Sequence, residues 1–377
     1  MKYSLLIKNG RVIDPSQSID GLMDVAIANG KIAALSKNIP ENNARSIIDA
    51  STLIVTPGLI DIHVHIAEGF SHYGINADRY CINKGVTTAV DAGSTGSSTF
   101  DGFKQHVLRV SKTSLKAFLN ISTTGMLIKG IGELENPRWC NVDMAVACGL
   151  RHKDVVLGIK VRLSKKQLGS TSDVHALKLA VDAASQLNVP VMAHIGDGPS
   201  PLEKLIPLLR GGDIITHAFT ARHNGILADN GKIFSCVKEA VARGVILDVG
   251  HGQGSFSFKT MEQALSQGVY PGSISSDLHT YNINGPVFDL ATTLSKFLRL
   301  GLSLDQVIGL ATFKPAKAVG MADVAGSLEP GRMADVTILK LDEGSFVFQD
   351  SFSKTSTSKQ RLQPVQVIKS GELHPIS

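Results

Sequence analysis

Residues 57–65 read PGLIDIHVH, a short apolar segment that ends in two histidines separated by one residue. Side chains at positions i and i+2 of a β-strand point to the same face, so His63 and His65 should project together. The segment predicts a buried strand with two imidazoles at its carboxyl end.

Seven further apolar segments of strand length follow, and most of them precede a stretch long enough for a helix. This alternation is typical of a parallel sheet built from βαβ units. Eight repeats over roughly 250 residues favour a closed, TIM-like (β/α)8 barrel over an open sheet. The sequence has no GxGxxG motif at a strand-to-helix turn, which also favours the barrel. The predicted strands lie within residues 53–65, 85–93, 115–122, 155–162, 189–196, 213–219, 244–252 and 273–279.

Both ends of the chain show a different pattern, in which apolar and polar residues alternate. Asn9-Gly10 and Asn29-Gly30 separate such segments near the start, and Asn-Gly between period-two runs predicts hairpin turns. Strand patterns return after the barrel, as in GRMADVTILKL from Gly331. The α/β chain should therefore combine a composite β-sandwich domain, residues 1–55 plus 325–377, with a barrel domain, residues 56–324.

Composition excludes several functions. The 377 residues are 43% hydrophobic, and 38 Lys and Arg against 33 Asp and Glu give a net charge of +5. No segment gathers the basic residues into the stripe that nucleic acid binding requires, and no uncharged apolar run approaches the ~18 residues of a membrane span. Four scattered cysteines do not suggest a disulfide framework. We expect a cytoplasmic protein that acts on a small molecule and is able to form a homo-oligomer.

Polar side chains capable of binding a metal end strand after strand at the same predicted rim. Enzymes on this fold place their active sites on that face of the barrel. Imidazole and carboxylate are ligands that suit zinc, and a catalytic site keeps one position open for water. The residues at this rim are His63, His65, Lys160, His194, His217, His251 and Asp277.

These residues resemble the amidohydrolase superfamily of metal-dependent hydrolases. The resemblance rests on PGLIDIHVH, on His194, His217 and Asp277, and on GSLEPGRMADVTIL from Gly326. The segments GIKVR, THAFTARHNGIL, DVGHGQGSF and SISSDLHTYNINGPVFDLATT are similar to its deacetylase-like branch, whose members are often labelled dihydroorotase or adenine deaminase.

The resemblance implies two divalent metal ions, zinc being the expected one. His63, His65 and Asp277 would bind the more buried ion and His194 and His217 the more exposed one. Lys160 would bridge both as an N6-carboxylated lysine, since a carbamate is a bidentate anion whereas an ammonium cannot ligate a metal.

The expected reaction is deacylation of a small N-acyl amine or O-acyl hydroxy acid by a metal-bridging hydroxide, which two cations make available near neutral pH. Asp277 is expected to accept the hydroxide proton and pass it to the leaving group. Four residues are candidates for substrate contact because they lie on or just after barrel strands: Arg162, Arg222, His251 and His279. Lys165 and Lys166 are expected to be solvated.

Three alternatives stay open. Opening of a cyclic amide, as in dihydroorotase, is disfavoured because HVHIAEGF lacks the arginine that such enzymes carry just after His-x-His. Purine deamination has one local indication, Glu68. A metal-free structural protein on the same fold is disfavoured because no ligand position is lost.

Overall fold

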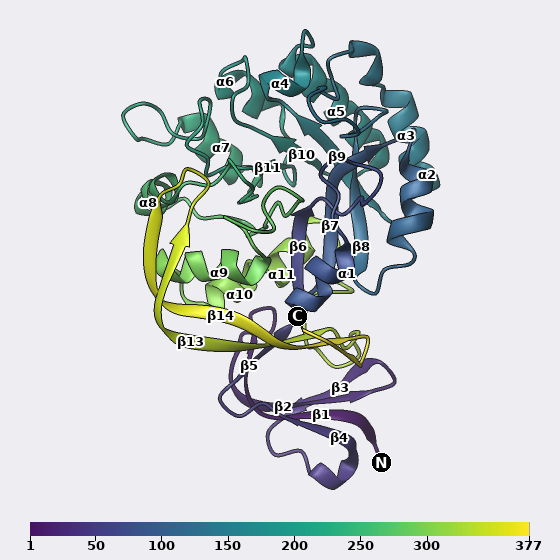
Figure 1. The fold of residues 1–377 in the computed structure, drawn as a ribbon, viewed down its shortest axis with the longest axis vertical. Coiled ribbons are helices and arrows are strands. Elements are labelled where there is room, and N and C mark those ends of the chain that lie inside the picture. The colour runs from purple at the N-terminus through teal and green to yellow at the C-terminus, as the bar shows by residue number, and fades with distance from the viewer. Residues whose placement is uncertain (377) are drawn as a thin grey trace.

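Seven parallel strands form a curved sheet (Figure 1), and three of the predicted metal ligands, His63, Lys160 and His194, lie on it. The computed structural model describes residues 1–376. The sheet order β12-β11-β10-β9-β8-β7-β6 means that each strand lies beside its neighbour in the chain. The strands are β6 Leu59–Val64, β7 Val86–Gly96, β8 Ser114–Asn120, β9 Val156–Arg162, β10 Val191–His194, β11 Ile214–Thr216 and β12 Ile246–Leu247.

Residues 273–278, the predicted eighth strand, span the gap between β12 and β6 without forming a regular strand. On one side, Val249 and His251 donate backbone N–H groups to Ser273 and Ser275. On the other, the N–H of Asp277 donates to the carbonyl of His63 at 2.7 Å. The architecture is thus TIM-like, as predicted, and this irregular segment delivers Asp277 to the end of β6.

Helices cover the outside of the barrel, and all six residues of β6 are buried because a parallel sheet is covered on both faces. Ser172 caps the longest helix, α5, by accepting the N–H of His175. The helices of the barrel are α1 Ala77–Tyr80, α2 Phe100–Phe103, α3 Val142–Arg151, α4 Lys165–Leu168, α5 Asp173–Leu187, α6 Leu202–Leu205, α7 Ser235–Ala242, α8 Phe258–Ser266, α9 Leu290–Arg299, α10 Leu304–Gly309 and α11 Phe313–Ala318.

The two ends of the chain share one mixed sheet, ordered β15-β14-β13-β5-β1-β2-β3 with β4 beside β1. Its β1–β4 and β1–β5 pairs are parallel, so the N-terminal region is not built only from the antiparallel hairpins that the Asn-Gly pattern predicted. The strands are β1 Tyr3–Asp14, β2 Ile19–Ala28, β3 Lys31–Ser36, β4 Ala44–Asp49, β5 Ile54–Pro57, β13 Val336–Gln349, β14 Thr355–Lys369 and β15 Glu372–His374. The domain limits at residues 56 and 325 stay a prediction.

The prediction of a turn at Asn9-Gly10 was wrong. Both residues lie inside β1, where the pairing with β2 shifts register between Ile7 and Gly10. Asn9 has a φ of 62°, and a Cβ at Gly10 would lie 2.5 Å from Val55. The pair therefore forms a bulge. Asn29-Gly30 does connect β2 to β3.

The long hairpin β13–β14 leaves the terminal sheet and runs along the barrel toward α8 (Figure 1). It is fastened at two places. The N–H of Leu362 donates to the Ser295 hydroxyl at 2.9 Å, and the N–H of Phe258 donates to Asp350 at 3.1 Å. The terminal sheet thereby reaches the loops that surround the barrel mouth.

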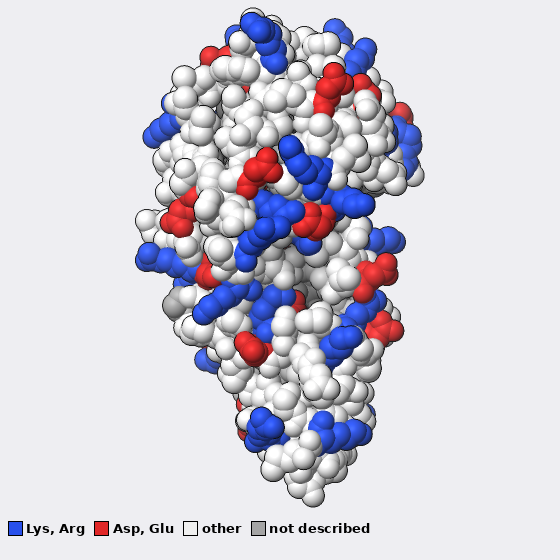
Figure 2. Space-filling view, turned by 90° about the vertical axis from the view of Figure 1, so that its right-hand side faces the viewer, with Lys and Arg blue, Asp and Glu red and all other residues white. Residues whose placement is uncertain are grey.

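Acidic and basic side chains are intermingled on the face drawn in Figure 2, with no continuous basic band across it. Within residues 1–376, no helix combines the length and apolar character needed to cross a bilayer.

Candidate metal centre

The carboxyl ends of the barrel strands open into one pocket of about 1080 Å³. It collects all the predicted metal ligands and three of the four predicted substrate contacts. The predicted residues that line it are His63, His65, Lys160, Arg162, His194, His217, Arg222, Asp277 and His279.

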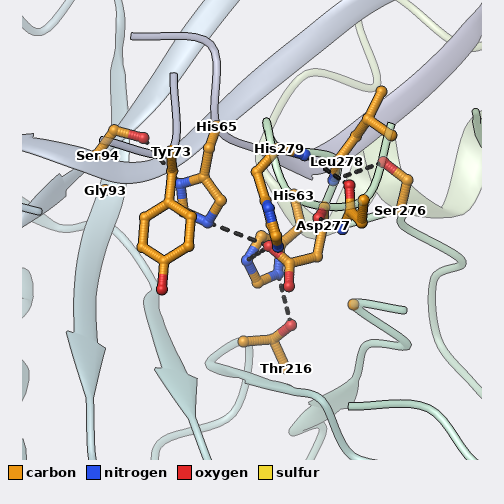
Figure 3. A network of polar contacts seen from close by, with 12 residues as sticks. His63, His65, Tyr73, Gly93, Ser94, Thr216, Ser276, Asp277, Leu278 and His279 are labelled. Carbon is orange, nitrogen blue, oxygen red and sulfur yellow. Dashed lines mark hydrogen bonds and ion pairs between the residues drawn. The ribbon is translucent and has the colours of Figure 1, made fainter. Parts of the chain in front are cut away.

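Imidazoles and Asp277 converge at the base of this pocket (Figure 3). Oδ1 of Asp277 is 3.1 Å from Nε2 of His65 and 3.4 Å from Nε2 of His63. One potential ligand atom from each of His63, His217 and Asp277 lies within 4.8 Å of the others, a spacing that could hold a metal ion. The ring of His194 is 4.3 Å from that of His217.

A buried hydroxyl fixes which nitrogen of His63 faces the pocket. Thr216 donates its single hydroxyl proton to Asp248 at 2.7 Å, so it must accept a hydrogen bond from Nδ1 of His63, also at 2.7 Å. This leaves the lone pair of Nε2 free toward Asp277. Nδ1 of His65 is likewise 2.8 Å from a buried hydroxyl, that of Ser94, whose backbone N–H donates to Asp91 at 2.7 Å.

The two remaining histidines are also oriented from behind. Nδ1 of His217 donates to the carbonyl of Gly250 at 2.7 Å, which leaves Nε2 free. For His194 the arrangement is reversed: Ser164 donates to the carbonyl of Gly196 and accepts from Nε2, leaving Nδ1 free. Hydrogen bonds on the outer nitrogen are the usual way in which metal-binding imidazoles are oriented.

Electrostatics favour neutral imidazoles here. Burial, followed by the charge of Lys160, lowers the pKa of His63 and of His65 well below the usual value. Burial likewise lowers the pKa of His217 to about 4. Since a metal binds the neutral ring, four oriented neutral imidazoles and a carboxylate are a donor set that fits a divalent ion.

Lys160 is fully buried and lacks an anionic hydrogen-bond partner among the described residues. Its Nζ contacts Nε2 of His63 at 3.3 Å and the sulfur of Met192 at 3.4 Å. Burial lowers its pKa to about 7, so much of the amine is unprotonated at neutral pH. Gly93 packs against its stem, where a Cβ would come within 2.5 Å. An uncharged buried amine at this position fits the chemistry that carboxylation requires.

Two residues of the centre have strained backbones. His217 has a φ of 63° and Asp277 a φ of 50°, values that non-glycine residues adopt rarely. Asn282 supports the second by donating its side-chain amide to the carbonyl of Asp277 at 2.8 Å. Strain of this kind is concentrated at functional sites.

Arg162 lies deeper in the pocket than its sequence position suggested, and it is only 7% exposed. It forms a bidentate pair with Glu133 at 2.5 and 2.7 Å, and its Nη1 donates to the hydroxyl of Tyr73 at 3.4 Å. One N–H of Nη1 and one of Nη2 have no acceptor in the described part of the chain. Sequence reasoning missed Glu133 and Tyr73, because neither lies near Arg162 in the chain.

Aromatic rings form one wall of the pocket beside Arg162. Tyr73 stacks on His65 with ring centroids 5.2 Å apart, and His279 lies 5.0 Å from Tyr73 (Figure 3). On another side, Arg222 pairs with Asp197 at 2.5 Å and donates to the carbonyl of Gly254.

The structure does not bring His251 to the pocket, so the predicted substrate contact is replaced by another role. Its Nε2 accepts a hydrogen bond from the buried Lys296 at 2.7 Å, and its carbonyl accepts one from Ser351 at 3.0 Å. It therefore fastens the loop after β12 to α9 and to the tip of the β13–β14 hairpin. Glu68 is exposed, outside the pocket lining, and accepts a hydrogen bond from Asn76 at 2.9 Å.

Comparison with known proteins identifies relatives over nearly the whole chain. The Amidohydrolase family profile matches residues 54–373. Deacetylase Atu3266 from Agrobacterium fabrum is 34% identical over 337 residues, which are 89% of this chain and 82% of the relative.

Two solved structures are similar in fold and sequence. An adenine deaminase has a TM-score of 0.92 at 33% identity and covers 99% of this chain and 100% of its own. A dihydroorotase has a TM-score of 0.90 at 31% identity, covering 99% and 98%. The reactions named for these three proteins differ, although all are similar to this chain.

Proposed function

This chain belongs to the amidohydrolase family of hydrolases, and from that premise we propose that it is a metal-dependent deacylase. Its substrate is a small N-acyl amine or O-acyl hydroxy acid. The observation that carries the proposal is the set of oriented, neutral imidazoles around Asp277 in one buried pocket. The relative named as a deacetylase supports the same reaction class.

In this proposal the donor set binds two divalent ions, and zinc suits it best. His63, His65 and Asp277 would hold one ion, His194 and His217 the other, and carboxylated Lys160 both. When bound, such ions lower the pKa of a water molecule and polarise a carbonyl group.

Asp277 moves the proton in this scheme. Its carboxylate lies beside the imidazoles of His63 and His65 and lines the pocket, where it accepts a proton from the attacking water. The water oxygen bonds to the acyl carbon as the bond from that carbon to nitrogen or oxygen breaks. Asp277 then returns the proton to the departing amine or alkoxide, which restores the carboxylate.

Arg162 binds the acid group of the substrate. Its pairing with Glu133 fixes the guanidinium plane, and the N–H groups without acceptors are available for a carboxylate. The hydroxyl of Tyr73, which already accepts from Nη1, can add a hydrogen bond to the same anion.

Deamination of purines is the weaker alternative. Glu68, the acidic residue that suggested it, does not line the pocket. Opening of a cyclic amide stays an alternative, because a carboxylate at Arg162 suits that reaction too.

Metal content and a hydrolysis screen test the proposal. Protein purified without chelator is expected to hold close to two zinc ions per chain. It should release acetate from N-acetyl amino acids or acetylated α-hydroxy acids, and leave dihydroorotate and adenine unchanged. Turnover of either of the last two, without acetate release, would replace deacylation by the corresponding alternative.

Lys160→Ala tests the metal arrangement. The variant is expected to lose metal and activity together, and a small carboxylic acid should restore part of the activity by substituting for the carbamate. Full metal content with unchanged turnover would show that Lys160 does not bridge the ions.

A further inference from the structure

Three lysines line the outer part of the pocket, beyond Arg162. We call Lys129, Lys165 and Lys166 the rim lysines. All three are exposed. Within residues 1–376, none of the three forms an ion pair, unlike Lys8, Lys104, Lys340 and Lys369.

The segments that carry the rim lysines are packed against each other. The N–H of Leu134 donates to the carbonyl of Gln167 at 2.9 Å. Gly132 lies so close to this second segment that a Cβ would be 2.5 Å from the carbonyl oxygen of Lys166. Lys129 is held at the same rim, with its Nζ 4.7 Å from the centroid of the Tyr281 ring. The loop after β8 and the short helix α4 after β9 therefore present three cations on one side of the mouth.

Of the three carboxylates that line the pocket, one offsets part of the rim charge. Asp197 pairs with Arg222. Glu135 accepts the N–H of Gly132 at 2.8 Å, a neutral donor, so it balances one of the three lysine charges. Asp277 lies at the base among the imidazoles. The outer part of the pocket therefore has an excess of positive charge, which attracts anions and raises their local concentration.

The rim lysines lie nearer the surface than Arg162 does. The guanidinium is buried and bound to Glu133, whereas the rim lysines are exposed at the mouth. Glu133 belongs to the same loop as Lys129, so the two levels are joined by one short segment. A pocket of about 1080 Å³ also exceeds the range typical for drug-sized ligands, about 300–1,000 Å³, and leaves space beyond a small acyl acid.

We propose that the rim lysines form a second anion subsite, and that preferred substrates are acylated dicarboxylic acids. One carboxylate binds at Arg162 and the other at the rim, while the acyl group reaches the base of the pocket. This inference rests on the proposed function for the acyl group, but anion recognition at the rim can be measured without turnover.

Binding of two matched compounds tests the subsite. N-acetylglutamate and N-acetylglutamine differ in one side-chain group, a carboxylate against an amide. Titration calorimetry at low ionic strength uses full-length, metal-loaded protein carrying Asp277→Asn, so that neither compound is consumed, and this protein with its rim lysines unaltered is the reference. It should show about threefold to tenfold tighter binding of N-acetylglutamate, the range that a few exposed ion contacts provide. The preference should decrease as salt is added. Acetate release is measured on protein with Asp277 intact.

The triple variant Lys129→Met, Lys165→Met, Lys166→Met keeps the alkyl chains and removes the charges. It should bind the two compounds with equal affinity. Its affinity for N-acetylglutamine should stay within about twofold of the reference protein, because the neutral amide of this compound forms no ion pair with the rim lysines. Lys359→Met, an exposed lysine of β14 outside the pocket, is the control and should keep the preference.

Equal binding of the two compounds by the reference protein, or no binding of either, would overturn the subsite. A preference that survives in the triple variant would overturn it as well. Acetate release is followed in parallel and tests a separate point: charge-dependent binding without any acetate release would support the subsite and contradict deacylation.

Discussion

Thr216 and Ser94 orient the two histidines at the end of β6. The Thr216 hydroxyl lies between Nδ1 of His63 and the buried carboxylate of Asp248, so it fixes the tautomer in which the Nε2 lone pair faces Asp277. The Ser94 hydroxyl contacts Nδ1 of His65 at 2.8 Å. Burial raises the pKa of Asp248, but three hydroxyl donors, from Thr216, Ser273 and Ser275, favour its charged form. The orientation of these imidazoles in the candidate metal centre therefore depends on residues that do not line the pocket.

Thr216→Val should weaken metal binding about tenfold to a hundredfold, the usual effect of removing a group that orients a metal-binding histidine. The valine keeps the shape of the side chain but removes the acceptor of the His63 Nδ1–H. Competition with a chromogenic zinc chelator measures the affinity directly.

Thr312→Val is the control for this change. That hydroxyl is also buried, but it donates to the carbonyl of Ile308 within its own segment. Zinc affinity should not change in the control. Unchanged affinity in Thr216→Val as well would mean that the hydroxyl does not govern how His63 binds metal.

Helix α9 places a buried lysine, Lys296, between two barrel loops. Lys296 is fully buried and donates to Nε2 of His251 at 2.7 Å and to the carbonyl of Pro286 at 2.8 Å. His251 precedes Gly252, which packs so closely on the carboxylate of Asp277 that a side chain there would collide with it. The helix thereby supports, from outside, the loop that backs the proposed proton carrier.

The pH dependence of stability should reveal this lysine. Burial lowers its pKa to about 7 in the folded protein, against about 10.4 in an unfolded chain. Between these values the unfolded chain binds more protons, so this group makes the free energy of unfolding rise with pH, by up to about 1.4 kcal/mol per unit. Below pH 7 both states are protonated and its contribution is constant.

Lys296→Met lacks this contribution. Relative to the variant, the unaltered protein should gain stability as pH rises from 7 to 10, measured by denaturant unfolding at several pH values. Lys359→Met, with an exposed lysine, should run parallel to the unaltered protein. A difference between Lys296→Met and the unaltered protein that does not vary with pH would contradict the lowered pKa.

At the scale of the whole molecule, the shared sheet joins the two chain ends to the barrel. Asp14 is buried at the end of β1, and its carboxylate accepts the N–H of Leu328 at 2.6 Å, beyond the last barrel helix. The same carboxylate accepts from Ser16 and Gln17. Together with the hairpin contacts to α8 and α9, this bond suggests that the sheet and the barrel unfold together.

Asp14→Ala should lower the free energy of unfolding by about 2–3 kcal/mol, because buried donors lose a charged acceptor. The fluorescence of Trp139, the only tryptophan, reports on the barrel, and far-ultraviolet circular dichroism reports on the whole chain. Both midpoints should shift by the same amount. A shift in circular dichroism alone would mean that the two parts unfold independently.

Asp20→Ala is the matched control for Asp14→Ala. Asp20 forms an exposed pair with Arg11, with side-chain exposures of 38% and 49%. Its removal should cost at most about 1 kcal/mol.

The sequence alone determined the barrel, the shared terminal sheet and the residues that meet at the pocket. Period-two and strand-helix patterns are local, and a parallel barrel brings every strand end to one rim, so His63, His194 and Asp277 could be grouped without coordinates. Asn9-Gly10 misled because the same dipeptide serves turns and bulges, and only the packing of Gly10 on Val55 distinguishes them.

Tertiary structure decided what surrounds those residues. Glu133 and Tyr73 reach Arg162 across 29 and 89 positions of the chain, and Thr216 reaches His63 across 153. His251 turned away from the pocket because Lys296, on a helix 45 residues later, offers a buried donor. Strand patterns specify which face a side chain takes, whereas its partner across the barrel depends on loops and helices whose paths no local pattern encodes.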